Sequence, residues 1–261
     1  MSGGHGLLKA FKIIALVWIL GVSMNAEAGL FGQTMSWQEE VLLHDGSKII
    51  AERHYNLGDY PAIESHNREA LDETVTFNLP GTNKKIVWKN DFRDSVPEPN
   101  SLNLIRFDVV KGVPYIATYP AGCIAYNKWG RPNPPQILFK YENGQWQRIT
   151  LAELPSELIG THANVIVGRP DVRIAKSFYT VEGVNAKNQD ISTPEYKTIL
   201  REAVANAGSA CPKMVSYGKG GWLGLDWFSD QPSFEACSKF CEIKNVSPQN
   251  CPCATLFTGP K

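Results

Sequence analysis

The sequence lacks an excess of charge of either sign, because its 261 residues contain 26 Lys and Arg against 26 Asp and Glu. A neutral chain argues against a nucleic-acid binder that acts through bulk positive charge. Glycine (22) and proline (17) stay close to ordinary usage, which excludes a collagen-like chain. With 43% hydrophobic and 10% aromatic residues, the chain can bury a large core and is not disordered.

Common catalytic motifs are also missing. The sequence contains no G-x-S-x-G nucleophile elbow, no H-E-x-x-H helix, no Walker loop and no G-x-G-x-x-G loop. We therefore predict no cofactor and no bound metal, and we favour a non-enzymatic function over an enzymatic one.

Residues 1–28 have the pattern of a secretory signal peptide. Lys9 and Lys12 precede an apolar run over residues 13–24, and A-E-A follows at residues 26–28. A spanning helix needs about 20 apolar residues, and this run is shorter, so we expect cleavage after Ala28 rather than a retained anchor. No later run is long enough to span a membrane, and the mature protein is predicted to be periplasmic or secreted.

The number of cysteines fits a periplasmic or secreted location. The six cysteines are Cys123, Cys211, Cys237, Cys241, Cys251 and Cys253. An even number in an oxidising compartment indicates disulfides. We predict one bridge between the first two cysteines, and two bridges that join Cys237 and Cys241 to Cys251 and Cys253. The alternatives for the last four cysteines are a zinc site and a redox-active C-P-C pair.

Strand-like runs that return through a turn recur four times before residue 152. Asp45-Gly46 separates the first two runs, and Asp-Gly is a strong hairpin signal because the turn needs positive φ. The other turns lie at residues 80–83, 111–112 and 142–145. Four hairpins predict an antiparallel β domain over residues 29–168, built as two packed sheets or an open barrel.

Residues 169–261 are predicted to pack on this domain as a helix and a cysteine-rich tail. A capping box at residues 192–195 precedes apolar residues at helical spacing: Tyr196, Ile199, Leu200, Ala203, Val204 and Ala207. This spacing predicts a helix that ends near Gly208 and covers one face of the sheet. Ser233 is expected to cap a short helix that carries Cys237 and Cys241. The predicted fold class is α+β, with a disulfide-stapled tail.

The first hairpin suggests a candidate catalytic cluster. A two-residue turn at Asp45-Gly46 pairs Glu39 with Glu52, and Trp37 with His54, on one face of the sheet. Glu39, Glu52 and His54 would then form a carboxylate–imidazole cluster suited to cation binding or acid–base chemistry. We favour the alternative, a frayed or bulged strand end with both carboxylates in water, because bulges are common at sheet edges.

Two loops have the composition of contact surfaces. Three prolines stiffen residues 127–135 around Trp129 and Arg131, and Trp and Arg are enriched at binding hot spots. In the second loop, glycines separate three aromatic residues, Tyr217, Trp222 and Trp227. Such aromatics can stack on sugar rings or on a partner protein. The alternative for both loops is structural, because prolines stiffen connections and aromatics pack over disulfides.

Three segments resemble those of a set of exported bacterial proteins of unknown function. They are W-Q-E-E-V-L-L-H-D-G at residues 37–46, K-W-G-R-P-N-P-P at 128–135 and W-Q-R-I-T-L-A-E-L-P at 146–155. The resemblance covers residues 37–167. It implies a periplasmic setting and an independent β-rich unit, and it implies no activity, cofactor or catalytic residue.

Together these observations predict a periplasmic binding or interaction protein, of the inhibitor or immunity type. Its expected partner is a protein or an envelope glycan, and not a nucleic acid. The alternative is a cell-envelope hydrolase that uses Glu39 and Glu52 with His54.

Overall fold

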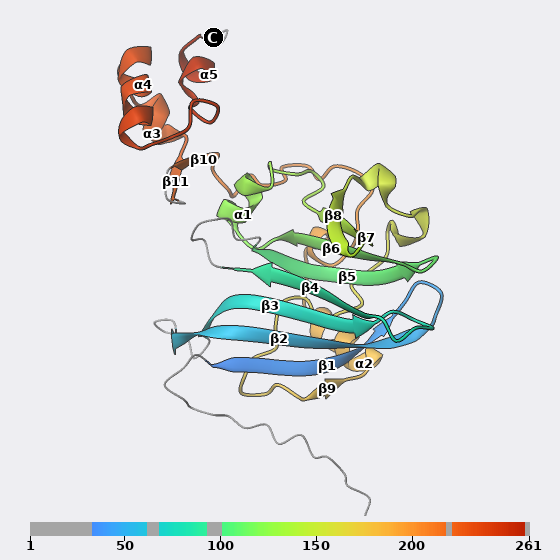
Figure 1. The fold of residues 1–261 in the computed structure, drawn as a ribbon. Coiled ribbons are helices and arrows are strands. Elements are labelled where there is room, and N and C mark those ends of the chain that lie inside the picture. Colours follow the sequence, from blue (N-terminus) through green and yellow to red (C-terminus); the bar gives the residue numbers. More distant parts are fainter. Residues whose placement is uncertain (1–32, 62–67, 93–100, 218–220, 259–261) are drawn as a thin grey trace, which may run out of the picture.

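The computed structural model describes residues 33–61, 68–92, 101–217 and 221–258. The predicted signal peptide lies outside the described residues. Two stacked β-sheets form the body of the protein, and a small C-terminal module stands apart from them (Figure 1). The predicted α+β class, with antiparallel sheets and a disulfide-stapled tail, is confirmed.

The first sheet has five strands in the order β4-β3-β2-β1-β9. They are β1 (Thr34–Leu42), β2 (Lys48–Pro61), β3 (Arg68–Asn78), β4 (Lys85–Asp91) and β9 (Phe178–Tyr179). Neighbouring strands are antiparallel except β9, which adds in parallel to β1. Buried and exposed side chains alternate along β1 and β4, so one face packs inward and the other meets solvent.

The second sheet is a four-stranded antiparallel meander, β5-β6-β7-β8. Its strands are β5 (Leu102–Val110), β6 (Val113–Pro120), β7 (Ile137–Glu142) and β8 (Gln145–Ile149), and helix α1 (Cys123–Lys128) connects β6 to β7. All four predicted hairpins are present, as β1–β2, β3–β4, β5–β6 and β7–β8. The local turn signals therefore identified the β framework correctly.

The main apolar core lies between the two sheets. Its larger buried side chains are Val41, Leu43, Val75, Phe77, Ile86 and Trp88 from the first sheet, and Leu102, Leu104, Phe107, Val109, Ile116 and Ile137 from the second. The rings of Phe77 and Phe107 meet with centroids 4.0 Å apart. Since burying one such side chain stabilises the fold by about 1.5–3 kcal/mol, this contact holds the two sheets together.

The helix predicted at residues 192–208 does not form, and this prediction is wrong. Only η3 (Pro194–Tyr196), a single 3₁₀ turn, follows the capping-box residues, and the chain is then irregular up to Met214. Between β8 and this region lie two further 3₁₀ turns, η1 (Leu151–Glu153) and η2 (Ser156–Leu158), and helix α2 (Val181–Asn188).

Side-chain amides of the preceding loop explain this outcome. Gln136 donates to the carbonyls of Glu195 and Thr198 and accepts from the N–H of Leu200. Asn133 exchanges two hydrogen bonds with the backbone of Val204. These partners satisfy backbone groups that a helix would have paired within itself, so the helix is not required.

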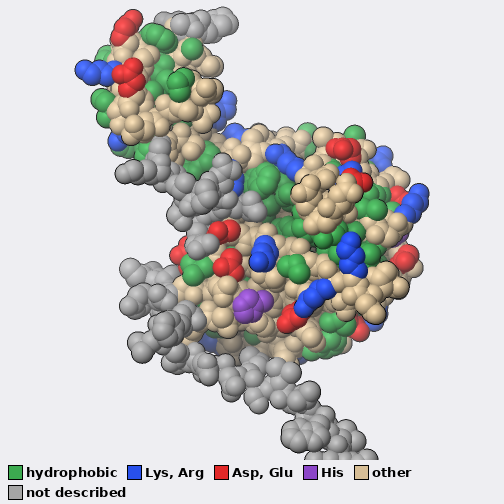
Figure 2. Space-filling model, in the orientation of Figure 1, with side chains coloured by type: hydrophobic (Ala, Val, Ile, Leu, Met, Phe, Trp, Pro, Cys, Tyr) green, Lys and Arg blue, Asp and Glu red, His purple; other side chains and the backbone are tan. Residues whose placement is uncertain are grey.

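The C-terminal module contains a hairpin and three short helices. Its elements are β10 (Met214–Tyr217), β11 (Gly221–Gly224), α3 (Asp226–Ser229), α4 (Phe234–Ile243) and α5 (Cys253–Thr258). The side chain of Ser233 caps α4 by accepting the N–H of Ala236, as predicted. In the space-filling view the module projects from the body (Figure 2).

Three disulfides are present: Cys123–Cys211, Cys237–Cys253 and Cys241–Cys251. The predicted connectivity is confirmed. The first bridge joins α1 to the segment that leads into β10, and the other two close the module. Among the described residues, no helix is long and apolar enough to cross a membrane.

Candidate functional site

The register of the first hairpin separates the residues predicted as catalytic. Leu43 and Ser47 close the turn, which leaves three residues in it, and Gly46 takes a φ of 84°. Glu39 therefore pairs with Ala51, and Glu52 pairs with Gln38. The predicted register is wrong by one residue, and a one-residue shift reverses the face of every side chain on the strand.

As a result, Glu39 and its two supposed partners lie on opposite faces of the sheet. Glu39 is fully buried on the inner face. Glu52 and His54 lie on the outer face, where His54 Nδ1 is 2.7 Å from the Ser36 hydroxyl. The three side chains do not converge on one substrate position.

Instead, Glu39 belongs to a buried ionic cluster with Arg53 and Glu73. Arg53 Nη1 donates to Glu39 at 2.9 Å, and Arg53 Nε donates to Glu73 at 2.5 Å. The guanidinium lies over the ring of Trp37, 5.0 Å from its centroid. Burial raises the pKa of Glu73 above its ordinary value, although the charge of Arg53 opposes this shift.

This cluster ties the first sheet to the loop that precedes β9. Arg53 donates to the carbonyls of Ile166 and Gly168, and Glu39 accepts the N–H of Ile166. Both Glu39 and Arg53 have no exposed surface. The cluster is closed to any ligand, and its arrangement indicates a structural role.

A second buried carboxylate, Asp108 of β5, holds the tip of the first hairpin. It lies 2.7 Å from His44 Nδ1 and accepts the backbone N–H of His44. The guanidinium of Arg106 donates two hydrogen bonds to Oδ2 of Asp108, the oxygen that also accepts the backbone N–H of His44. Such a carboxylate fixes an imidazole ring in place, but among the described residues no Ser, Thr or Cys side chain is bonded to His44.

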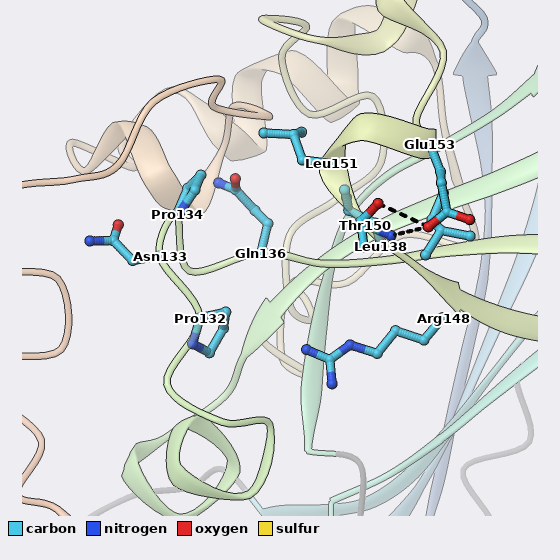
Figure 3. Close-up of a pocket in the computed structure, with 10 residues that line it drawn as sticks. Pro132, Asn133, Pro134, Gln136, Leu138, Arg148, Thr150, Leu151 and Glu153 are labelled. Carbon is cyan, nitrogen blue, oxygen red and sulfur yellow. Dashed lines mark hydrogen bonds between the residues drawn. The ribbon is translucent and has the colours of Figure 1, made fainter.

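A pocket with a volume of about 390 Å³ lies beside β7 and β8 (Figure 3). It is lined by Pro132, Asn133, Pro134, Gln136, Leu138, Arg148, Ile149, Thr150, Leu151 and Glu153. Most of these residues come from segments 128–135 and 146–155, two of the three segments that carried the resemblance. Prolines line one side of the pocket, and Thr150 and Glu153 lie on the other.

Two charged side chains of the pocket face the solvent without a salt bridge. In the described part of the chain, neither Arg148 nor Glu153 has an oppositely charged partner within ion-pair distance. Glu153 accepts the N–H and the hydroxyl of Thr150 at 2.8 and 2.9 Å, and these bonds hold its pKa below the ordinary value. The guanidinium of Arg148 lies 5.2 Å from the ring centroid of Trp129 and donates to the Trp129 carbonyl at 3.3 Å.

The amide side chains of the pocket are held by hydrogen bonds to another segment of the chain. Asn133 and Gln136 hold the irregular segment at residues 195–204, as described above. The pocket therefore has rigid walls and offers a ligand one cation and one anion.

The structure places Trp129 and Arg131, the residues predicted for the first contact loop, in different surroundings. Trp129 is half-buried and packs edge-on against Phe139, with ring centroids 5.9 Å apart. Arg131 donates to the carbonyls of Gly208, Cys211 and Pro212, and so holds the connection to the C-terminal module. A role of either side chain in partner binding stays a prediction.

The second contact loop forms the hairpin β10–β11 and helix α3. Tyr217 and Trp222 are partly buried, and Tyr217 packs against the core of the module. Trp227 is 54% exposed. Residues 218–220 lie outside the described residues.

Arg148 and Glu153 were not identified from the sequence, although a signal for them exists. The predicted hairpin that turns at residues 142–145 pairs Leu138 with Ile149. Its two open ends, which lead into the proline loop and into η1, must therefore lie side by side. Combining this register with the two motif segments would have located the pocket.

Comparisons of the chain with protein-family models, with curated proteins and with solved structures found no match.

Proposed function

We propose that this protein is an exported binding protein that holds a segment of a polypeptide partner in the pocket beside β7 and β8. One observation carries the proposal: two segments separated in the sequence, 128–135 and 146–155, line one pocket and leave Arg148 and Glu153 without salt bridges. Inhibitor and immunity proteins act by such binding.

The rigidity of the pocket supports binding. Prolines fix the backbone on one side, and the amides of Asn133 and Gln136 are held by hydrogen bonds to residues 195–204. A site that is ordered before binding loses little conformational entropy when a ligand enters.

The lining favours a polypeptide over a glycan. No aromatic side chain lines the pocket, whereas sugar rings commonly stack on aromatic faces. Arg148 and Glu153 suit a carboxylate and an amine or amide N–H of a peptide. Glu153 is the only carboxylate among the lining residues, while most glycoside hydrolases use a pair, so the pocket fits binding better than hydrolysis.

Export is part of the same proposal. Disulfides form and persist in oxidising compartments, and three are present here. We expect a periplasmic or secreted protein that begins at Gly29 after cleavage. Intact-mass analysis of the protein recovered from the periplasm checks this, and a product that retains Met1 contradicts it.

Site-specific photo-crosslinking in living cells tests the binding. A photoreactive amino acid at Ala152, which is exposed between two lining residues, should capture a discrete polypeptide. The same amino acid at Ile50, exposed on the outer face of the first sheet, is the control position.

Arg148→Ala should reduce the adduct at position 152 at least tenfold. Arg173→Ala, which removes an exposed arginine elsewhere, should leave it unchanged. Capture of a glycan, equal adducts at both positions, or an adduct that Arg148→Ala does not reduce would contradict the proposal.

A further inference from the structure

The four cysteines of the C-terminal module form one compact sulfur cluster. Cys237 and Cys241 lie one turn apart on α4, and Cys251 and Cys253 flank Pro252 where the chain returns into α5. Three of the four are fully or almost fully buried, whereas Cys251 is half-buried.

Sulfurs of the two different bridges are close enough to touch. Cys253 Sγ lies 3.6 Å from Cys241 Sγ and 3.4 Å from Cys251 Sγ. The sulfurs of Cys241, Cys251 and Cys253 all lie within 4.8 Å of one another, and Cys237 is bonded to Cys253. The fold thus brings three sulfurs together, and the fourth is bonded to one of them.

This spacing matches a tetrahedral metal site. A metal ion with four metal–sulfur bonds of about 2.3 Å holds its sulfurs about 3.8 Å apart. The contacts between the bridges are already close to that value. Opening both bridges to a similar separation would complete a set of four sulfurs.

We propose that the module has a second state, in which the four reduced cysteines bind one soft divalent ion, such as Zn²⁺, as thiolates. An all-sulfur ligand set selects such ions over Mg²⁺ or Ca²⁺. The ion would replace both bridges as the link between α4 and the segment that leads into α5. The module would then keep its fold when its disulfides are reduced.

The second state forms by reduction of the two bridges, followed by metal binding. Each bridge takes two electrons and two protons from a dithiol, which becomes a disulfide, and yields two thiols. One divalent ion then displaces four protons from the four thiols and forms four metal–sulfur bonds. Oxidation by a disulfide of higher potential reverses the change and releases the ion.

The surroundings of the cluster suit a closed structural site. Val215, Phe228 and Val246 are buried around it and exclude water. No His, Asp or Glu side chain joins the three cysteines in the only ligand group found among the described residues. All four ligands would therefore be thiolates, as in structural zinc sites.

Cobalt binding to the reduced full chain tests the proposal. The Cys123→Ser/Cys211→Ser variant leaves only the four module cysteines and is reduced with a phosphine. Titration with Co²⁺ should produce the visible bands of tetrahedral cobalt thiolate, saturating at one ion per chain, and Zn²⁺ should abolish them. The oxidised protein is the control and should give no bands.

A second measurement keeps the test independent of any folding defect. Without metal, all four thiols of the reduced variant should react with a thiol reagent, and equimolar Zn²⁺ should protect all four. Adding Cys251→Ser should weaken Zn²⁺ binding at least a hundredfold. Absence of the cobalt bands, or full reactivity of the thiols in the presence of Zn²⁺, overturns the proposal.

Discussion

Arg53 illustrates, at the scale of the residue, how the protein accommodates a charge with no contact to water. Its guanidinium is bonded to two carboxylates, two backbone carbonyls and the hydroxyl of Tyr55. A buried ion pair contributes little net stability, yet removing one partner is costly because the other charge stays buried. The cluster therefore favours this one arrangement of sheet and loop over others.

Replacing Arg53 tests this energetic role. Arg53→Met keeps a similar volume but leaves Glu39 and Glu73 without a counter-charge, so we expect the free energy of unfolding to fall by about 3–5 kcal/mol. Urea denaturation with the disulfides intact measures the change. Lys89→Met, on the exposed face of β4, is the control and should change stability by less than about 0.5 kcal/mol. Equal effects of the two substitutions would contradict the role of the cluster.

Glu73 should also make stability depend on pH in an unusual direction. Burial raises its pKa above the ordinary 4.5, so between the two values the folded protein binds more protons than the unfolded chain. Its contribution to stability is complete below pH 4.5 and is lost as the pH rises through the folded pKa.

Glu73→Gln removes this titration and should remove its pH dependence. The stability of the wild type minus that of the variant is expected to fall as the pH rises from 4.5 through the raised pKa of Glu73. Urea denaturation of both proteins across that range measures the difference. A difference that stays constant or rises with pH would contradict the assignment.

Residue positions were only partly predictable from the sequence. Trp37, Glu39 and Val41 alternate on one face of β1, and the pattern indicates that they share that face. Which residues of β2 oppose them depends on the length of the turn. Gly46 suits both a two-residue and a three-residue turn, so local sequence did not determine the register of Glu39.

At the scale of the element, hairpins were predictable and the helix at residues 192–208 was not. A hairpin is specified by its own turn residues, which the sequence shows directly. The apolar residues of the 192–208 segment have helical spacing, but the segment does not form a helix. The amide of Gln136, some 60 positions earlier in the chain, holds its backbone in another conformation. A tertiary contact of this kind leaves no local signal.

Removing that amide should release the irregular segment. Gln136→Met deletes three hydrogen bonds and leaves their backbone partners unpaired, and we expect a loss of about 2–4 kcal/mol. Hydrogen exchange should quicken at residues 195–204 and not in β1 or β2. Gln145→Met, at an exposed position in the β7–β8 hairpin that follows Gln136, is the control and should leave exchange unchanged. Faster exchange throughout the protein would contradict this local role.

The whole molecule consists of a body and a module that are joined at few points. The module has its own core, around Val215 and Phe228, and its own two bridges. The bridge Cys123–Cys211 and the hydrogen bonds of Asn127 and Arg131 attach it to α1 and the following loop. The bridge pattern was predictable from cysteine spacing, whereas this separation into two units depends on where apolar side chains find partners in space.

Two cores with a narrow connection should unfold as separate units. Cys123 and Cys211 are 88 residues apart, and opening a bridge of that span costs about 4.6 kcal/mol through the entropy of the unfolded chain. The segment between these two cysteines contains β7 and β8 but no part of the module. In the Cys123→Ser/Cys211→Ser variant, hydrogen exchange should therefore show that the opening free energy of the amides of β7 and β8 falls by about that amount. The amides of α4 should keep their wild-type protection, because the two bridges of the module remain closed. If α4 lost as much protection as the sheets, body and module would form one cooperative unit, and the division into two would be wrong.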